Sequence, residues 1–323
     1  MSETGHTLGV MGTLVWDRIV SIGTPPVERW GGIGYALAAA SVALPSGWTV
    51  RPVVRVGADL AAEARTLVDQ LSRTHASGLV EVAEPNNRVE LLYEDDANRV
   101  ERLTGGVTGW PTDDLIRETA TCDALLLNFV SGYEASVETC EALRADFRGP
   151  IYADLHSLCL GRQSDGTRVP QRLEGWRRWV ACFDFVQMNE AEFDLLGTGA
   201  GPAVSIEDVV TEGPAVVAVT RGAAGATIAV RDGARVDVRD VTLGSPQPGD
   251  PTGCGDVWGA TMFSRLLAGD EPLSAAQSAN EMASVSTRQR GVEGLAERLA
   301  EHRSGTEARG VRGSTDSNSE GES

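Results

Sequence analysis

The chain has 323 residues, 41% of them hydrophobic and 23% charged, which predicts a soluble globular protein with a sizeable core. A formal net charge of −18 opposes non-specific binding to nucleic acid or to an anionic membrane surface. The sequence contains no lysine and all 28 basic side chains are arginine, so a phosphate-binding loop of the Walker type, which needs a lysine, is excluded.

The expected compartment is the cytoplasm. No apolar run approaches the ~20 residues that span a bilayer, and the first ten residues lack the features of a secretory signal. The cysteines are scattered without CxxC spacing, so they predict reduced thiols rather than a zinc site or a disulfide framework. They are Cys122, Cys140, Cys159, Cys182 and Cys254.

In chain order, short β-rich apolar runs alternate with segments of helical periodicity. Helical periodicity is clearest over residues 60–71 and 134–147. This alternation predicts a mostly parallel sheet covered by helices. The apolar runs cover residues 7–19, 48–57, 123–130, 150–155, 184–189 and 215–220.

Two interruptions of this pattern predict β-hairpins. Residues 87–103 alternate polar and apolar side chains around an Asp-Asp-Ala-Asn turn, which is typical of a lid or a dimer contact. Residues 226–241 turn about Asp232-Gly233. Helices are then expected at about 253–267, 274–289 and 291–302, and the polar tail 303–323 is predicted to be disordered.

The stretch Gly249 to Ala260, GDPTGCGDVWGA, carries the clearest chemical signal. Gly253 and Gly255 remove Cβ atoms at the start of a predicted helix, where free backbone amides attract anions. The amides of Gly253, Cys254 and Gly255 would hold a phosphoryl group, and Asp256 would accept a proton from an attacking hydroxyl. From these residues alone, a simple helix cap with a glycine loop is an equally good interpretation.

This stretch resembles the second signature of the ribokinase-like, or phosphofructokinase B-type, sugar kinases. Asp250, Gly253, Gly255 and Asp256 match that signature, and an aromatic residue follows at Trp258. Pro251 and Cys254 depart from its commonest residues, although Cys254 still supplies an amide.

Further resemblances follow in family order between Leu8 and about Leu299. They imply a substrate site, an ATP site and metal-organising groups, with Glu192 acting on magnesium largely through water and Asp250 near a monovalent cation such as potassium. The substrate-binding residues so implied are Asp17, Gly31, Gly32 and Asn128. The implied ATP-binding residues are Asn189, Thr220, Gly222, Gly225 and Asn280.

The resemblance implies an α/β fold, a three-layer sandwich with a mostly parallel central sheet and a small β lid. The kinase domain would span residues 1–302, with the hairpin 87–103 and part of 19–30 inserted as the lid. The lid would close over the substrate and exclude water, and a homodimer could form through it. His156 is expected to be structural, because the mechanism of this family needs no histidine.

The implied activity is transfer of the γ-phosphoryl group of ATP to a hydroxyl of a sugar or sugar-like molecule, with Asp256 as general base. Ala36 stands where sugar-phosphorylating relatives commonly carry an asparagine, and Tyr35 makes the neighbouring pocket more apolar. A nucleoside kinase and a catalytically inactive sugar-binding regulator therefore stay open as alternatives. A dinucleotide-dependent oxidoreductase is disfavoured, because the Gly-x-Gly-x-x-Gly pattern is missing after the first strand.

Overall fold

The computed structural model describes residues 5–21, 25–93, 99–197, 203–244 and 249–316. The tip of the predicted 87–103 hairpin, part of the 19–30 segment and the end of the tail lie outside the described residues.

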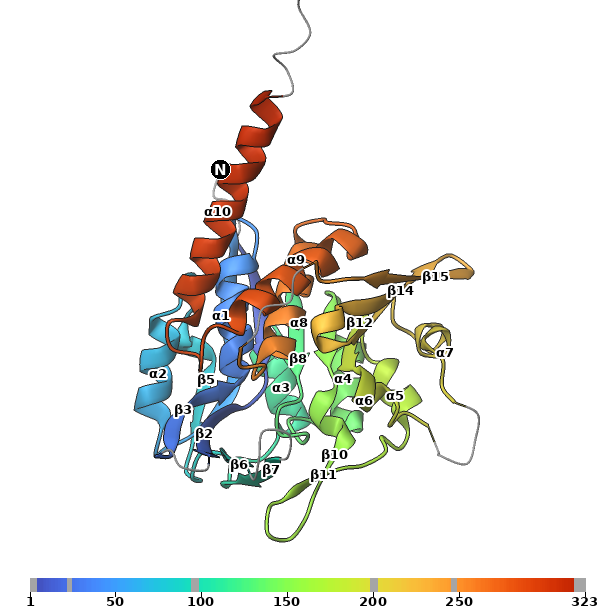
Figure 1. Cartoon of the computed structure of the whole chain (residues 1–323). Coiled ribbons are helices and arrows are strands. Elements are labelled where there is room, and N and C mark those ends of the chain that lie inside the picture. Colours follow the sequence, from blue (N-terminus) through green and yellow to red (C-terminus); the bar gives the residue numbers. More distant parts are fainter. Residues whose placement is uncertain (1–4, 22–24, 94–98, 198–202, 245–248, 317–323) are drawn as a thin grey trace, which may run out of the picture.

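A nine-stranded sheet forms the centre of the molecule (Figure 1). Its pairs from β13 through β5 are parallel, and β14 and β15 extend one edge as an antiparallel hairpin. The predicted mostly parallel sheet and the hairpin at 226–241 are therefore confirmed. In spatial order the strands are β15 (Arg235–Val241), β14 (Ala226–Asp232), β13 (Val216–Thr220), β12 (Phe185–Asn189), β9 (Ile151–Asp154), β8 (Ala124–Asn128), β1 (His6–Met11), β4 (Trp48–Gly57) and β5 (Leu79–Val82).

Helices cover both faces of this sheet, as predicted for a three-layer sandwich. They are α1 (Ile33–Ala43), α2 (Ala61–Asp69), α3 (Thr112–Thr119), α4 (Val137–Asp146), α5 (Trp176–Val180), α6 (Glu190–Phe193), α7 (Ile206–Thr211), α8 (Cys254–Leu267), α9 (Pro272–Ser286) and α10 (Leu295–Asp316). Short 3-10 helices lie at Ala76–Gly78, His156–Cys159 and Gly222–Ala224.

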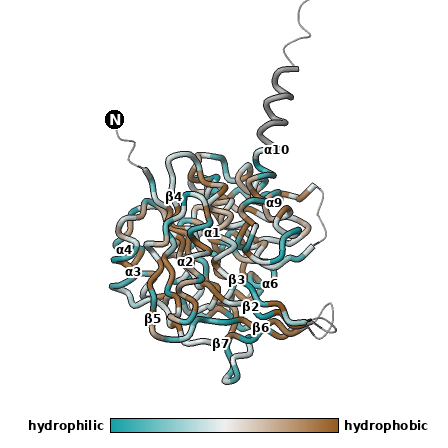
Figure 2. The backbone as a smooth tube through the Cα atoms, turned by 90° about the vertical axis from the view of Figure 1, so that its left-hand side faces the viewer, coloured by the Kyte–Doolittle hydropathy of each residue, from teal (hydrophilic) through white to brown (hydrophobic). Residues whose placement is uncertain are grey.

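Successive residues of the buried strands point to opposite faces and so build two separate cores. In β8, Ala124 and Leu126 join the core beneath α1, α2, α8, α9 and α10. Leu125 and Leu127 join the core beneath α3, α4, α5 and α7. The hydrophobic segments accordingly concentrate inside the molecule (Figure 2).

A second sheet of four strands lies at one end of the central sheet (Figure 1). Its order is β3 (Val27–Gly32), β2 (Leu14–Ser21), β6 (Arg88–Tyr93) and β7 (Arg99–Thr104). The antiparallel pair β6 and β7 falls on the predicted hairpin. A further hairpin, not among the predicted elements, is formed by β10 (Leu160–Arg162) and β11 (Arg168–Pro170). It adjoins β7, where Leu103 N donates to Gly166 O at 2.9 Å.

The single apolar run predicted at 7–19 is divided between the two sheets. β1 ends at Met11, and β2 begins at Leu14 in the smaller sheet. The break falls at Gly12, where a Cβ atom would lie 2.7 Å from Cδ1 of Ile33. The chain therefore changes sheets where only glycine fits against α1.

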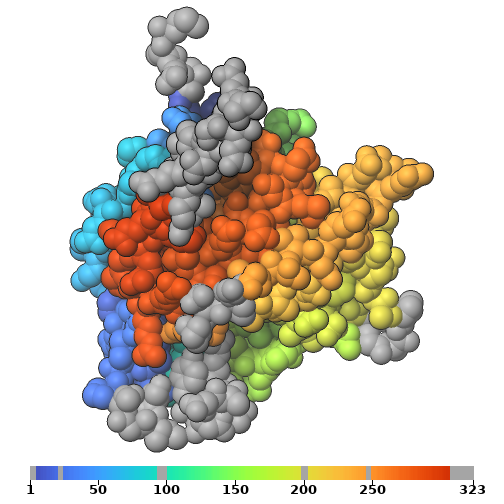
Figure 3. Space-filling view, turned by 45° about the horizontal axis from the view of Figure 1, so that its top comes forward, coloured from blue at the N-terminus to red at the C-terminus, as the bar shows by residue number. Residues whose placement is uncertain are grey.

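Helix α10 continues past residue 302, where the sequence predicted the folded domain to end. No proline interrupts residues 295–316, and Ala, Arg and Glu there favour helix, so the first turns, anchored by the buried Leu295 and Leu299, propagate. α9 and α10 lie on one face of the molecule, and the β14–β15 hairpin extends beside them (Figure 3). Within the described residues, no helix combines the length and apolarity needed to cross a bilayer.

The central sheet brings four polar residues to one edge, because the carboxyl ends of parallel strands meet there. Asn128 at the end of β8 pairs with Asp154 at the end of β9. Asn189 at the end of β12 pairs with Thr220 at the end of β13. The following turns and the start of α8 surround this edge.

Candidate active site

The start of α8 is built around a glycine that no other residue can replace without a collision. Gly253 is the N-cap with φ 76°, in the left-handed region that favours glycine. A Cβ atom on Gly253 would lie 2.3 Å from Cγ of Tyr35, because the ring of Tyr35 packs directly on this backbone. The apolar side of α8, including Val257 and Phe263, is buried in the core and fixes the helix in this position.

Two of the three predicted amide donors remain available at this turn. The amide of Cys254 donates to the carbonyl of Pro251 at 3.1 Å. The amides of Gly253 and Gly255 have no acceptor among the described residues. Of the predicted anion site, these two glycine amides are therefore the donors without a partner within the described protein.

Asp256 lies in the first turn of α8 and faces a cleft of about 310 Å³. Its Oδ1 accepts a hydrogen bond from Nδ2 of Asn128 at 2.6 Å. Burial, with a further contribution from Asp154, raises the pKa of Asp256 to about 6, although His156 and Asn128 act to lower it. A carboxylate of this kind is ionised at neutral pH and still basic enough to accept a proton.

Asp154 and His156 form a pair at the end of β9, facing Asp256. Asp154 Oδ1 lies 3.2 Å from His156 Nδ1, and it also accepts the His156 backbone N–H at 3.2 Å. Asp154, His156 and Asp256 each present one potential ligand atom within 4.8 Å of the others. Burial acts to lower the pKa of His156, but the carboxylates of Asp154, Asp256 and Glu192 outweigh it and raise the pKa to about 10.

Asn189 and Glu192 close the other side of the same cleft as a capping box on α6. Glu192 Oε2 accepts the Asn189 N–H at 2.7 Å, and Asn189 Oδ1 accepts the Glu192 N–H at 2.9 Å. Burial raises the pKa of Glu192 to about 7, with the carboxylates of Asp154 and Asp256 adding to the effect of burial against the opposing charge of His156. The oxygen atoms of Asn189 and Glu192 are ligands of the kind that magnesium prefers. Both oxygens of the Glu192 carboxylate already accept hydrogen bonds from Asn189, which suits contact with the ion through a water molecule.

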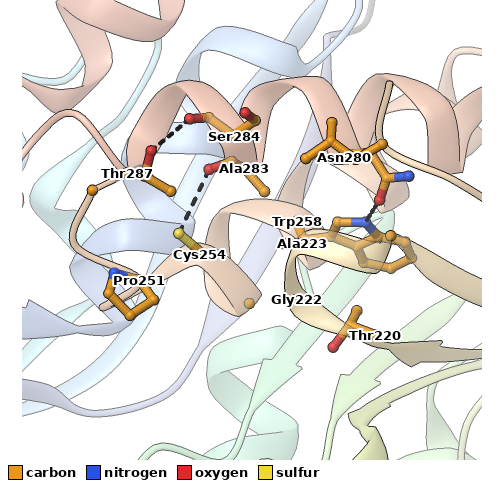
Figure 4. Close-up of a pocket in the computed structure, with 14 residues that line it drawn as sticks. Thr220, Gly222, Ala223, Pro251, Cys254, Trp258, Asn280, Ala283, Ser284 and Thr287 are labelled. Atoms are coloured by element: carbon orange, nitrogen blue, oxygen red, sulfur yellow. Dashed lines mark hydrogen bonds between the residues drawn. The ribbon is translucent and has the colours of Figure 1, made fainter. Parts of the chain in front are cut away.

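A second cavity of about 320 Å³ adjoins the cleft, since Thr220, Pro251 and Gly255 line both (Figure 4). Its walls are mainly carbon and one of them is the indole of Trp258, so they suit a flat apolar group such as a nucleobase. It is lined by Thr220, Gly222, Ala223, Gly225, Leu243, Gly249, Pro251, Cys254, Gly255, Trp258, Asn280, Ala283, Ser284 and Thr287. The structure thus brings together the predicted ATP residues of the 220–225 turn and Asn280.

Asn280 is held in one orientation by two hydrogen bonds. Its Oδ1 accepts from Nε1 of Trp258 at 2.8 Å (Figure 4), and its Nδ2 donates to the carbonyl of Val241 at 3.0 Å. Gly225 has φ 95°, and a Cβ atom there would lie 2.1 Å from the same carbonyl of Val241. Gly222 also has a positive φ, of 53°, but no atom within 4 Å of a Cβ placed there. The cavity wall is therefore fixed by β14, β15 and α9 together.

Three of the predicted substrate residues, Asp17, Gly31 and Gly32, lie where the smaller sheet meets α1. A Cβ atom on Gly31 would lie 1.9 Å from Oδ2 of Asp17, so the buried carboxylate sits directly over that glycine. Gly32, with φ 59°, is the N-cap of α1, and a Cβ atom there would lie 2.4 Å from the carbonyl oxygen of Thr13. Burial and then the carboxylates of Asp17, Asp256 and Asp250 raise the pKa of the buried Tyr35. Tyr35 therefore lies within the electrostatic reach of both Asp17 and Asp256.

Asp250 occupies the turn just before α8. Its Oδ1 accepts from the Thr252 N–H at 3.0 Å, and its backbone N–H donates to the Thr287 carbonyl at 2.8 Å. Oδ2 of Asp250 lies 3.9 Å from Nε of Arg290, whose side chain is 78% exposed. This carboxylate thus faces an arginine at the position predicted for a monovalent cation.

His156, which the family resemblance implies to be structural, lines the cleft. The signal that could have found it is the Asp-x-His spacing directly after β9, at the edge where the other site residues gather. The pairing of Asp154 with this histidine depends on the turn of the 3-10 helix that follows β9.

The model of the pfkB family carbohydrate kinases matches residues 161–298. No curated protein matches the chain in sequence. Among solved structures, a pyrophosphate-dependent kinase in the ribokinase family, in a sulfate complex, is 16% identical with a TM-score of 0.72, over 90% of this chain and 99% of that chain.

Two further solved structures are similar. Burkholderia thailandensis nucleoside kinase in complex with inosine is 17% identical, with a TM-score of 0.67, over 90% of this chain and 93% of that one. Arabidopsis thaliana ribokinase complexed with ribose and ATP is 18% identical, with a TM-score of 0.65, over 91% of this chain and 99% of that one. At these identities the likeness shows the fold.

Proposed function

We propose that the chain is a ribokinase-like, pfkB-type carbohydrate kinase and acts as an ATP-dependent phosphotransferase, a proposal supported by the family match over residues 161–298 and by the fold. The acceptor in this proposal is a hydroxyl of a sugar or sugar-like small molecule. The observation that carries the proposal is the position of Asp256 in a polar cleft that adjoins an apolar cavity, with Gly255, the residue before it, lining both.

Asp256 is the proposed general base. Its pKa of about 6 leaves the carboxylate ionised at neutral pH, and the hydrogen bond from Asn128 fixes the direction in which it points. The amides of Gly253 and Gly255 would donate to the phosphoryl oxygens as negative charge develops. The acceptor proton would pass to a carboxylate oxygen of Asp256 while the acceptor oxygen attacks phosphorus.

Magnesium is proposed as the cofactor, held through water by Glu192 and positioned with the help of Asn189. When bound, the ion supplies charge neutralisation for the donor phosphates. The capping box supports this role because it presents a carboxylate in a fixed orientation beside the cleft.

ATP is the proposed donor, and the cavity beside the cleft is what supports a nucleotide. A donor without a base, such as the pyrophosphate used by one structural relative, would occupy only the cleft. The apolar cavity lined by Trp258, Ala283 and Leu243 would then contact no part of the donor. Thr220, Gly222, Gly225 and Asn280 are the proposed ATP contacts.

The acceptor is proposed to lie between the smaller sheet and Asp256, with Asp17 accepting from its hydroxyls and Gly31 and Gly32 giving it backbone access. The smaller sheet would act as the lid of a single domain that begins at the N-terminus and ends in α10. A homodimer through this sheet stays a prediction, and chromatography with light scattering tests it. The cytoplasm also stays a prediction, supported by five free cysteines.

We also propose a monovalent cation near Asp250, where the ion would compete with Arg290 for that carboxylate. Rates measured in potassium and in a bulky organic cation decide the point. Equal rates would remove the cation from the proposal.

The test of the function is ADP formation from ATP across a panel of sugars, polyols and nucleosides, with and without Mg²⁺. We expect at least one sugar-like acceptor to stimulate ADP formation only when Mg²⁺ is present. Stimulation by nucleosides alone would make the protein a nucleoside kinase, and use of pyrophosphate in place of ATP would overturn the donor assignment. Sugar binding in calorimetry without any turnover would instead identify a regulatory protein.

A further inference from the structure

The polar cleft is acidic for a space that must receive phosphates. Asp154, Glu192 and Asp256 line it. Among the described residues that line it, His156 is the one basic side chain, and no lysine exists in the chain to reach it. A donor polyphosphate entering this cleft would meet three carboxylates and one imidazole.

The geometry of His156 leaves one ring nitrogen for a ligand. Nδ1 lies 3.2 Å from Oδ1 of Asp154, whose side chain is only 6% exposed. The backbone N–H of His156 donates to the same oxygen, so the ring is fixed relative to the end of β9. A buried carboxylate on Nδ1 holds the proton there, and Nε2 is then the nitrogen that is free to serve the cleft.

We propose that His156 is a catalytic residue that donates Nε2–H to a phosphoryl oxygen of the donor, and that Asp154 positions it. This inference rests on the proposed phosphotransferase function and adds a group to it. The imidazolium stays protonated throughout, and the acceptor proton still goes to Asp256, so no atom is transferred to or from His156.

The charge state of the ring supports this role. The surrounding carboxylates come from three elements, with Asp154 on β9, Glu192 on α6 and Asp256 on α8, and together they raise the pKa of His156 to about 10. These carboxylates favour the protonated form of the imidazole. The contacts of the ring nitrogen and the backbone N–H with Asp154 hold the ring in place before the donor arrives, so little reorganisation is needed as charge develops on the phosphoryl group.

The competing chemistry for the same three side chains is a transition-metal site. Asp154, His156 and Asp256 have ligand atoms within 4.8 Å of one another, which suits a divalent ion bound by imidazole and carboxylates. A metal would require a neutral imidazole, whereas the proposed contact with the donor uses a ring that keeps its protons. Metal content therefore separates the two possibilities.

The test uses the full chain with His156→Asn and His156→Arg, and His75→Asn as the matched control on an exposed histidine. With an acceptor that the wild type phosphorylates, we expect His156→Asn to lower kcat by about 10²–10³, the usual cost of one preorganised donor, with little change in the acceptor KM. The pH at which the rate falls on the acidic side should also rise, because His156 lowers the pKa of Asp256. His156→Arg should restore part of kcat.

A kcat of wild-type size in His156→Asn overturns the inference while leaving the kinase assignment intact. Stoichiometric zinc or manganese in the purified wild type, lost in His156→Asn, also overturns it. If the wild type phosphorylates nothing, the proposed function fails, and binding of a non-hydrolysable ATP analogue then decides the role of His156. At least tenfold weaker analogue binding in His156→Asn, but not in His75→Asn, supports a phosphate contact, and equal binding overturns it.

Nuclear magnetic resonance of the ring nitrogens adds a readout that needs no activity. The chain has four histidines, so the signal lost in His156→Asn identifies the ring. We expect that ring to remain protonated at pH 8, and a neutral ring at pH 7 would contradict the inference.

Discussion

Asn128 Nδ2 lies 2.6 Å from Asp256 Oδ1, so the end of β8 holds the carboxylate at the start of α8. Asn128 is buried, and its own Oδ1 has no hydrogen-bond partner among the described residues. Nδ2 of Asn128 is therefore occupied by Asp256, whereas Oδ1 of Asn128 is an acceptor without a donor among the described residues. An acceptor hydroxyl bound beside Asp256 would satisfy that oxygen.

Asp256→Asn should lower kcat by about 10²–10⁴, because an amide cannot accept the hydroxyl proton. The hydrogen bond from Asn128 can persist, since the new side chain keeps one carbonyl oxygen. Steady-state kinetics on an active acceptor measure the effect, with Asp69→Asn, at an exposed position at the end of α2, as the control. Near-unchanged turnover would remove Asp256 from the mechanism.

Activity should fall as the pH drops through about 6, because Asp256 must be ionised to act as a base. Asn128→Ala removes a hydrogen bond that lowers the pKa of Asp256, so this acidic limb should move to higher pH. The pH dependence of kcat/KM measures both effects. A variant with a lower rate and an unmoved limb would show that Asn128 acts on something other than the carboxylate.

Asp256→Asn should also stabilise the protein at pH 8. The pKa of Asp256 is raised in the folded state from 3.8 to about 6, so the folded protein holds an additional proton between these values and loses stability as the pH rises through this window. The variant avoids that loss, which is at most about 3 kcal/mol. Urea unfolding should show little difference near pH 4 and a more stable variant at pH 8. A less stable variant at pH 8 would contradict the assigned direction of the shift.

Gly253→Ala should destabilise the fold by about 1–3 kcal/mol, because the new Cβ meets the ring of Tyr35 at a positive φ. Gly255→Ala is the matched control, since a Cβ there has only Gln187 Nε2 within 4 Å, at 3.7 Å. Thermal unfolding measures both. Adding Tyr35→Ala to Gly253→Ala separates the collision from the backbone cost, and equal melting temperatures for the two glycine variants would contradict the geometry.

The sequence predicted what depends on local pattern and left out what depends on contacts across the chain. The alternating strands and helices, the hairpin about Asp232-Gly233 and the start of α8 within one residue follow from periodicity and turn residues. The division of the 7–19 run into β1 and β2 does not, because apolar alternation is the same in either sheet.

The site shows the same limit. The glycines and Asp256 are visible in one short motif, so the sequence could place them at a helix start. The ring of Tyr35 on Gly253 and the effects of Glu192 and Asp256 on the charge of His156 arise from residues distant in sequence. No local pattern encodes those relationships.

Asn280→Ala should raise the KM for ATP about tenfold while leaving the acceptor KM unchanged. The substitution leaves Nε1 of the buried Trp258 without its 2.8 Å acceptor and frees the indole that walls the donor cavity. Asn280→Asp keeps an oxygen for Trp258 but loses the donor to Val241, so its KM for ATP should rise less. Gln277→Ala, on the exposed side of the same helix, is the control. Because the effect acts through the cavity for the base, affinity for pyrophosphate should be the same in the wild type and the three variants. A parallel loss of pyrophosphate binding in Asn280→Ala would show that Asn280 supports the phosphate cleft instead.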